Sequence, residues 1–174
     1  MEELVNAYLP QILRAARGMG FPTEESENLA QSVFLALIES LDNFQGRSHI
    51  RTFIFGIFYN KVSEHLRFKQ RARQEEDIDS IMENRFDARG AWRQPLADLE
   101  RELFSREIGS TIRDCLEVIP QAQRLAFILR EGEEMATAEI CKIMGISATN
   151  FGVLLYRARN RLRECVERKG IRRG

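Results

Sequence analysis

Hydrophobic residues recur at intervals of three and four positions through most of this chain, which is the spacing of one face of an α-helix. Stripes of this kind predict helices over about 4–17, 23–41, 50–73, 98–119 and 121–130. We expect a bend near Pro10 in the first helix and an N-cap at Thr23 in the second. No segment combines strict alternation of polar and apolar residues with hairpin turns, as strands would require. The pattern therefore predicts an all-α protein.

The last forty residues carry the most informative pattern, a helix, a tight glycine turn and a second, strongly basic helix. The first helix follows Ala136, the turn lies at Gly145, and the second helix runs from Phe151 to Arg163. The small side chain of Cys141 lets the two helices approach, and glycine tolerates the positive φ of the turn. This spacing predicts a helix-turn-helix, whose usual task is to place a helix in the major groove of DNA.

Residues 74–99 interrupt the helical pattern, because they have mixed charge and weak periodicity and contain Gly90 and Pro95. We interpret them as a linker, in which Phe86 and Trp92 either dock on a partner or pack back onto a domain. The chain is then two small helical domains, over 1–74 and 104–174, joined by a flexible linker over 75–103.

The distribution of charge says more about the partners than its sum does. The chain has 174 residues, 30% of them charged, and a formal net charge of zero. Residues 61–73 hold five basic residues and one acid, and residues 157–173 hold eight basic residues and two acids. The acidic run 75–79 lies between them. Two basic segments indicate two contacts with one polyanion, the alternative being two solvated helix faces.

The cysteines and histidines favour structural roles. Cys115 and Cys165 lie on apolar helical stripes and Cys141 lies in the helix-turn-helix, so we expect three buried thiols in a reducing compartment. No CxxC pair is present, and His49 and His65 lack ligand spacing. Neither zinc nor another cofactor is therefore expected.

The remaining composition indicates the cytoplasm. No apolar run approaches the roughly 18 residues of a membrane span, and the acidic start, residues 1–4, does not resemble a signal peptide. We expect no membrane insertion and no fused regulatory domain after Arg173.

Taken together, these motifs resemble the extracytoplasmic-function (ECF) group of bacterial sigma factors over nearly the whole chain. Residues 25–34 and 44–67 resemble the polymerase-binding and promoter-melting motifs of the family's region two. Residues 116–129, 139–147 and 156–163 resemble region four, and the last segment carries the specific ending Arg-Ala-Arg-x-x-Leu-Arg. The resemblance implies a dissociable polymerase subunit that directs promoter recognition and melting, and not an enzyme.

The resemblance also implies three contact surfaces. Contact with the clamp helices of core RNA polymerase falls to Glu25, Glu27, Asn28 and Gln31, and region four would meet the polymerase flap. Binding and melting of the minus-ten element falls to Gln45, Gly46, Arg47, Ser48, Asn60, Lys61, Arg67 and Arg71. Contact with the minus-thirty-five element falls to Ser147, Ala148, Thr149, Asn150, Gly152, Arg157 and Arg159.

The chemistry of these residues agrees with such roles. Unpaired bases stack on aromatic faces and their phosphates bind cations, and the helix over 50–73 begins aromatic and ends basic. We expect Phe53, Ile54, Ile57 and Phe58 to be core residues all the same. The arginines of the last helix suit phosphate contacts, which add affinity and salt dependence but little sequence choice.

Departures from the family pattern suggest how the protein is controlled. Asn28 and Ser32 stand where many relatives carry acids, and Leu154 stands where an arginine is common. Some relatives that lack the acids are activated by phosphorylation near Thr52, so a Ser/Thr kinase is one candidate regulator. The alternative for Thr52 is a helix cap. The more usual regulator in the family is an anti-sigma factor, often membrane-bound, that contacts both domains.

Two other classes of protein remain as alternatives. A conventional helix-turn-helix regulator would dimerise on a palindrome, and its ligand-binding domain would not need the basic segment 61–73. A small helical enzyme is a distant third, because no nucleophile motif or carboxylate pair stands out.

Overall fold

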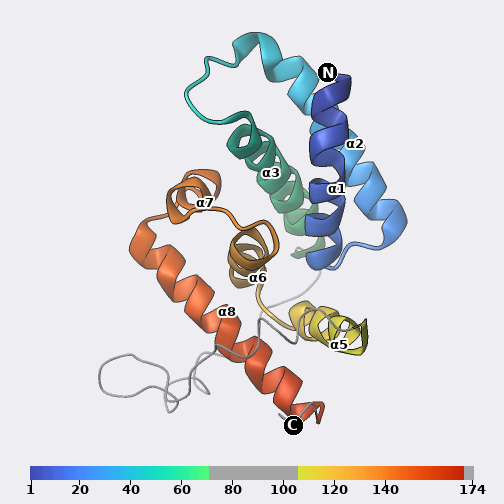
Figure 1. Ribbon diagram of the computed structural model, residues 1–174, viewed down its shortest axis with the longest axis vertical. Helices are drawn as coiled ribbons and strands as arrows, with labels where there is room; N and C mark the ends of the chain where they lie inside the picture. The colour runs from blue at the N-terminus through green and yellow to red at the C-terminus, as the bar shows by residue number, and fades with distance from the viewer. Residues whose placement is uncertain (71–105, 171–174) are drawn as a thin grey trace.

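A computed structural model describes residues 1–70 and 106–170 of this chain, with side chains over 1–66 and 110–170. Within these ranges the chain is helical and contains no strand, which confirms the all-α fold class. Two groups of helices are present (Figure 1), which we call the N-terminal bundle (1–70) and the C-terminal bundle (106–170).

The N-terminal bundle consists of three helices and a short 3₁₀ turn. These are α1 (Glu2–Gly18), α2 (Thr23–Ser40), η1 (Leu41–Asn43) and α3 (Ile50–Gln70). The helix α1 continues through Pro10, and the predicted cap at Thr23 is wrong. Pro22 occupies the N-cap position of α2 without a side-chain cap bond, and Thr23 is the first helical residue.

The C-terminal bundle holds four α-helices and one π-helical turn. These are α5 (Arg106–Glu117), α6 (Gln121–Phe127), η4 (Ile128–Gly132), α7 (Thr137–Met144) and α8 (Ala148–Arg168). The predicted helix-turn-helix is α7 and α8, joined at Gly145, whose φ of 65° lies in the left-handed region that glycine tolerates. The Ser147 side chain caps α8 by accepting a hydrogen bond from the Asn150 amide at 3.1 Å.

The two bundles share one continuous hydrophobic core. The helix α7 packs against α3, and η4 lies against α1 (Figure 1). At Gly18 a Cβ atom would stand 3.0 Å from Ile128 Cδ1, and at Gly20 it would stand 3.0 Å from Arg124 Nη1. These two glycines let the C-terminal bundle approach the turn between α1 and α2 closely.

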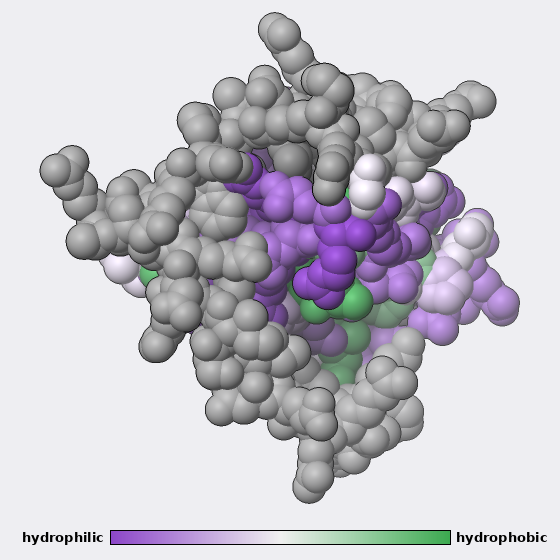
Figure 2. Space-filling model, turned by 90° about the horizontal axis from the view of Figure 1, so that it is seen from below, coloured by the Kyte–Doolittle hydropathy of each residue, from purple (hydrophilic) through white to green (hydrophobic). Residues whose placement is uncertain are grey.

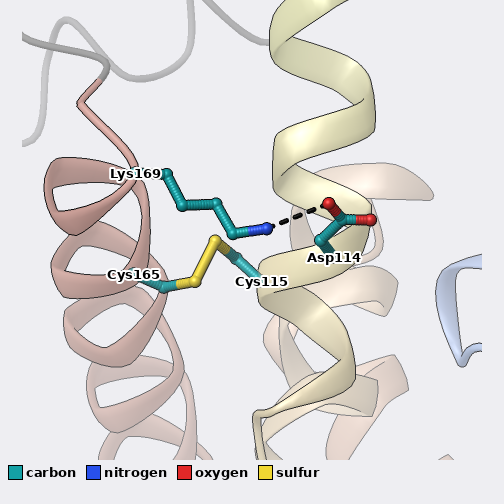
Figure 3. Close-up of a disulfide and its surroundings, with 4 residues drawn as sticks. All are labelled: Asp114, Cys115, Cys165 and Lys169. Carbon is teal, nitrogen blue, oxygen red and sulfur yellow. Dashed lines mark hydrogen bonds and ion pairs between the residues drawn. A yellow bond between two sulfur atoms is a disulfide. The ribbon is translucent and has the colours of Figure 1, made fainter.

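The cysteine expectation needs a correction. Cys115 on α5 and Cys165 on α8 form a disulfide with Cα atoms 5.6 Å apart (Figure 3), and Cys141 is a free, half-buried thiol. Their helical stripes face each other across the C-terminal bundle, since α5 packs against α8. Periodicity placed Cys115 and Cys165 on inward faces correctly but carries no information about which inward faces meet.

The predicted linker, with Phe86 and Trp92, lies outside the described residues, and the proposed domain boundaries remain predictions. Among the described helices none is by itself long and apolar enough to cross a membrane, although α7 and α8, bent by 97°, meet the length and composition criteria as a pair. In Figure 2 the described part of one face is mostly hydrophilic, with a small hydrophobic area at its centre.

We expect reduction of the Cys115–Cys165 disulfide to lower the free energy of unfolding by up to about 4 kcal/mol, because the bond closes a loop across a sequence separation of 50 residues. Urea unfolding with and without dithiothreitol measures the difference. The variant Cys141→Ser should show the same loss on reduction as the wild type, and Cys115→Ser should show none. Equal midpoints for the oxidised and reduced wild type would contradict the expectation.

Candidate nucleic-acid interface

The residues expected to read a duplex form one exposed surface at the start of α8. Ser147, Ala148, Thr149, Asn150 and Gly152 are all exposed. The Ser147 hydroxyl oxygen already accepts the Asn150 amide bond. The side chains of Thr149 and Asn150 therefore have the freest access to base edges.

Sequence reasoning missed Arg130, which holds this surface in place. Its guanidinium lies 5.4 Å from the centre of the Phe151 ring, and Phe151 is buried at the base of α8. The same group donates to the Met135 carbonyl at 2.9 Å and to the Thr137 hydroxyl. Arg130 thus links η4, the start of α7 and α8. Its only sequence signal was a cation at the end of the predicted helix over 121–130.

The arginines of α8 divide into exposed and paired groups. Arg157 is exposed and forms no ion pair with the described residues. Arg159 is half-buried and donates to the Glu131 carboxylate, with its Nε 3.1 Å from Oε1. Arg163 is buried and bonds Glu167 at 2.9 Å. Of the expected phosphate contacts in this helix, Arg157 is therefore the best placed, and Arg159 is already engaged within the bundle.

The loop expected to take part in binding the minus-ten element precedes α3. Gln45, Gly46 and Arg47 are exposed, and Ser48 is half-buried. The Phe44 ring lies 4.8 Å from the Phe53 ring, which anchors the loop to α3. Gly46 has a φ of 66° in open space, a conformation that favours glycine.

Along α3 the apolar residues split between core and surface. Ile54 and Phe58 are fully buried, as expected, and so is Phe55. Phe53 and Ile57 are only half-buried, so the expectation that they belong wholly to the core is too strong.

The polar residues expected along α3 are placed only in part. Asn60 is exposed, and Lys61 pairs with Glu64 at 3.4 Å. Arg67 lies on α3 with its side chain outside the described set, and Arg71 lies outside the described residues.

The expected polymerase surface lies on α2. Glu27, Asn28 and Gln31 are exposed, and Glu25 lies 3.5 Å from His65 Nε2. A groove of about 560 Å³ between α2 and α3 brings residues of two predicted surfaces together. Its lining includes Glu25, Asn28, Ser32, Lys61, Glu64 and His65.

Sequence reasoning also missed two exposed apolar residues on α2. Leu35 is 62% exposed and Ile38 is 51% exposed, and both follow Gln31 at helical spacing. Large exposed aliphatic side chains beside polar ones are typical of a protein-docking surface.

Charged and polar contacts cross between the bundles. The Glu133 side chain has no exposed surface, and Arg14 donates to both of its carboxylate oxygens, at 2.9 and 2.7 Å. These bonds raise the pKa of Arg14 above its ordinary value. The Thr52 hydroxyl, which is buried on α3, donates to the Glu139 carboxylate at 3.2 Å. Thr52 is the third residue of α3, so it does not cap that helix.

A second contact lies at the opposite end of the interface. Arg124 is buried and donates to the carbonyls of Met19 at 2.7 Å, Glu117 at 2.5 Å and Ile119 at 3.2 Å. Burial lowers the pKa of Arg124 from its ordinary value. The carbonyls supply the partners that a buried guanidinium requires.

Fold and surfaces together define a class: a two-part helical DNA-binding protein with one helix-turn-helix and a separate aromatic-basic helix. Residues 4–72 match the pattern of sigma-70 region 2, and residues 110–162 match that of sigma-70 region 4. The chain is 32% identical over 151 residues to a probable RNA polymerase sigma factor of Haemophilus influenzae, across 83% of this chain and 78% of that protein. The chain belongs to the ECF group of the sigma-70 family.

Further comparisons agree with this assignment. The ECF RNA polymerase sigma-E factor of Escherichia coli K12 is 26% identical over 138 residues, which are 79% of this chain and 72% of that protein. The fold resembles RpoE of Bartonella quintana, solved with the anti-sigma factor NepR, with a TM-score of 0.69, 22% identity and 98% of each chain covered. It also resembles CnrH, solved with the cytosolic domain of CnrY, with a TM-score of 0.67 and 21% identity over 97% and 88% of the two chains.

The family decides between the three classes considered above. This protein is an alternative sigma factor that directs promoter-specific transcription initiation. The family assignment rules out the conventional helix-turn-helix regulator. Sigma factors as a family are transcription initiation factors. Within residues 1–66 and 110–170 no group of three or more His, Cys, Asp or Glu side chains is arranged to hold a metal ion.

We expect Gly152→Ala to separate stability from DNA affinity. A Cβ at this helical position meets nothing within 4 Å, so alanine should stabilise α8 by about 0.5–1 kcal/mol. The added methyl group should nevertheless weaken binding to promoter DNA several-fold if the backbone there approaches the duplex. Thermal unfolding and fluorescence anisotropy measure the two effects. Unchanged affinity would remove Gly152 from the DNA surface, and Gly145→Ala is the control that should lose stability through strain alone.

Proposed function

We propose that the two bundles divide the promoter between them, the N-terminal bundle binding and melting the minus-ten element and α8 reading the minus-thirty-five element. Two separate exposed surfaces of the required chemistry on one chain support this most directly. Thr149, Asn150 and Arg157 supply base-edge and phosphate groups on one, and Arg47 and Asn60 supply them on the other.

The polymerase partner follows from the α2 surface. The exposed side chains of Glu27, Asn28, Gln31, Leu35 and Ile38 follow one another along this helix. Acids, amides and exposed aliphatic groups in one stripe suit a protein partner better than DNA. We assign this stripe to the clamp helices of core RNA polymerase and a second contact, by the C-terminal bundle, to the flap. In this role the protein binds and positions and catalyses nothing itself.

An anti-sigma factor is the regulator that the comparisons support. One of the two similar structures is of a sigma factor bound to an anti-sigma factor, and the other is of CnrH bound to the cytosolic domain of CnrY. A cleft of about 1000 Å³ between the bundles, lined by Tyr8, Arg14, Arg51, Phe127 and Glu134 among others, offers a place for part of one.

Run-off transcription with core polymerase, in the presence and absence of this protein, tests the proposal. Genomic fragments carrying its own promoters should give a product only when both components are present. Absence of any promoter-dependent product, together with absence of co-purification with core polymerase, would reject it.

We expect Arg157→Ala to weaken binding of promoter DNA about equally for all sequences and to lower the slope of log K against log salt by about one. Its exposed guanidinium, which pairs with no acid within 1–66 and 110–170, suits a phosphate contact. Salt titrations by fluorescence anisotropy give the slope. Arg168→Ala, which removes the same charge from the far end of α8, is the matched control and should leave the slope nearer to that of the wild type.

We also propose Thr52 as a phosphorylation site, with a Ser/Thr kinase as the partner. Because its hydroxyl is buried against Glu139, a kinase reaches it only when the bundles part. We expect Thr52→Asp to recover more core polymerase in a pull-down than Thr52→Ala, since the new carboxylate faces that of Glu139 and repels α7. Adding Glu139→Gln should reduce the difference. Equal recovery of both single variants would refute a role for charge at this position.

A further inference from the structure

We infer that this sigma factor holds itself closed by an ionic latch, in which the buried Glu133 of the C-terminal bundle binds Arg14 and Arg51 of the N-terminal bundle. The latch keeps the start of α3, at Arg51 and Thr52, covered until the bundles separate. The inference rests on the proposed division of the promoter between the bundles, because it concerns the control of that same surface.

The latch is a bidentate ion pair between Arg14 and Glu133, with Arg51 as a second cation close to the same carboxylate. Arg14 presents Nε and Nη2 to the two carboxylate oxygens of Glu133, at 2.9 and 2.7 Å. Arg51 Nη2 donates to the Glu133 main-chain carbonyl and stands 3.9 Å from Oε2. The carboxylate is wholly buried, and among the described residues its ion-pair partners are Arg14 and Arg51 of the opposite bundle.

The backbone around Glu133 is specialised to deliver this side chain. The π-helical turn η4 closes with a bond from the Glu133 amide to the Ile128 carbonyl at 3.0 Å. The next residue, Glu134, has a φ of 52°, the one positive value at a non-glycine position among the described residues. A π-helical turn and a positive φ at a non-glycine residue are both uncommon, and they flank one buried acid. They indicate that the backbone here is constrained to place the Glu133 side chain in the interface.

The closed arrangement covers the start of α3 and contacts the backbone of the loop before it at one point. The helix α7 packs on α3, where Thr52 bonds Glu139. Lys142 Nζ donates to the Arg47 carbonyl at 2.9 Å. Arg51 and Thr52 belong to the segment that resembles the promoter-melting motif, and both are occupied by acids of the C-terminal bundle.

Distance shows that this arrangement is incompatible with reading both promoter elements. Elements about 25 base pairs apart are separated by about 85 Å of duplex at 3.4 Å per base pair. Lys142 touches Arg47, and it precedes Ser147 by five residues, which span at most about 18 Å. The two DNA surfaces therefore lie far too close together, and the bundles must separate before both elements are bound.

Arg14→Gln tests the latch, because it leaves a buried carboxylate short of a partner while changing a side chain that is 58% exposed. Arg17→Gln, an exposed arginine one turn further along α1, is the matched control. Small-angle X-ray scattering on the full chain reports compactness, and circular dichroism confirms that each variant is folded. The double variant Arg14→Gln/Glu133→Gln removes the unpaired charge.

We expect Arg14→Gln to increase the radius of gyration, because it leaves an unpaired charge in the closed arrangement. The double variant should increase it to a smaller extent, because it lacks the pair altogether, and Arg17→Gln should stay near the wild-type value. Apparent affinity for core polymerase should rise about tenfold in Arg14→Gln and stay unchanged in Arg17→Gln, since apparent affinity scales with the open fraction. A folded Arg14→Gln with wild-type scattering would overturn the latch. Wild-type scattering in the folded double variant would do so as well, because the chain would then stay closed without the pair. The scattering experiment uses neither polymerase nor promoter DNA. A failure of run-off transcription therefore counts against the proposed function only, and the scattering result still tests the latch.

Discussion

The burial of one carboxylate, that of Glu133, constrains how the two halves of this molecule are arranged. A buried charge must have its partners within hydrogen-bonding distance, and here the partners belong to the other bundle. Removing one partner of such a pair costs about 3–5 kcal/mol in other proteins, whereas the complete pair adds little net stability. The contact therefore selects one arrangement of the bundles but adds little to the stability of that arrangement. Such a contact suits an interface that has to open.

Acids beside the DNA-binding surfaces contribute to a net charge of zero in a DNA-binding protein. The segment from η4 to the first turn of α7 concentrates acids that face basic or polar groups of these surfaces. Glu131 meets Arg159, Glu133 meets Arg51, and Glu139 meets Thr52. Glu133 and Glu139 therefore contact groups of the N-terminal bundle in the closed chain and become available to solvent when the bundles part, whereas Glu131 and Arg159 lie in the same bundle.

The sequence predicts the helices and the helix-turn-helix well because these follow from local spacing. It also predicts which face of each helix is buried, as Ile54 and Phe58 show. It does not predict the Cys115–Cys165 bond or the ion pair of Glu133, since each joins residues far apart in the chain. It does not predict the role of Arg130 either, because this residue's contacts with Met135, Thr137 and Phe151 depend on how η4, α7 and α8 are arranged. From the sequence alone, the acids among residues 131–134 are interpreted as part of a solvent-exposed turn. The burial of Glu133 becomes evident only when the arrangement of the bundles is known.

The disulfide acts within one bundle, whereas the ion pair of Glu133 acts between the two bundles. The Cys115–Cys165 bond joins α5 to α8 within the C-terminal bundle, and Lys169 and Asp114 form an ion pair at 2.9 Å beside it (Figure 3). It stabilises that bundle as a unit. Glu133 and Arg124 instead join this unit to the N-terminal bundle through reversible polar contacts. A covalently braced bundle held by reversible contacts can separate from its neighbour without unfolding, as binding at two distant promoter elements requires.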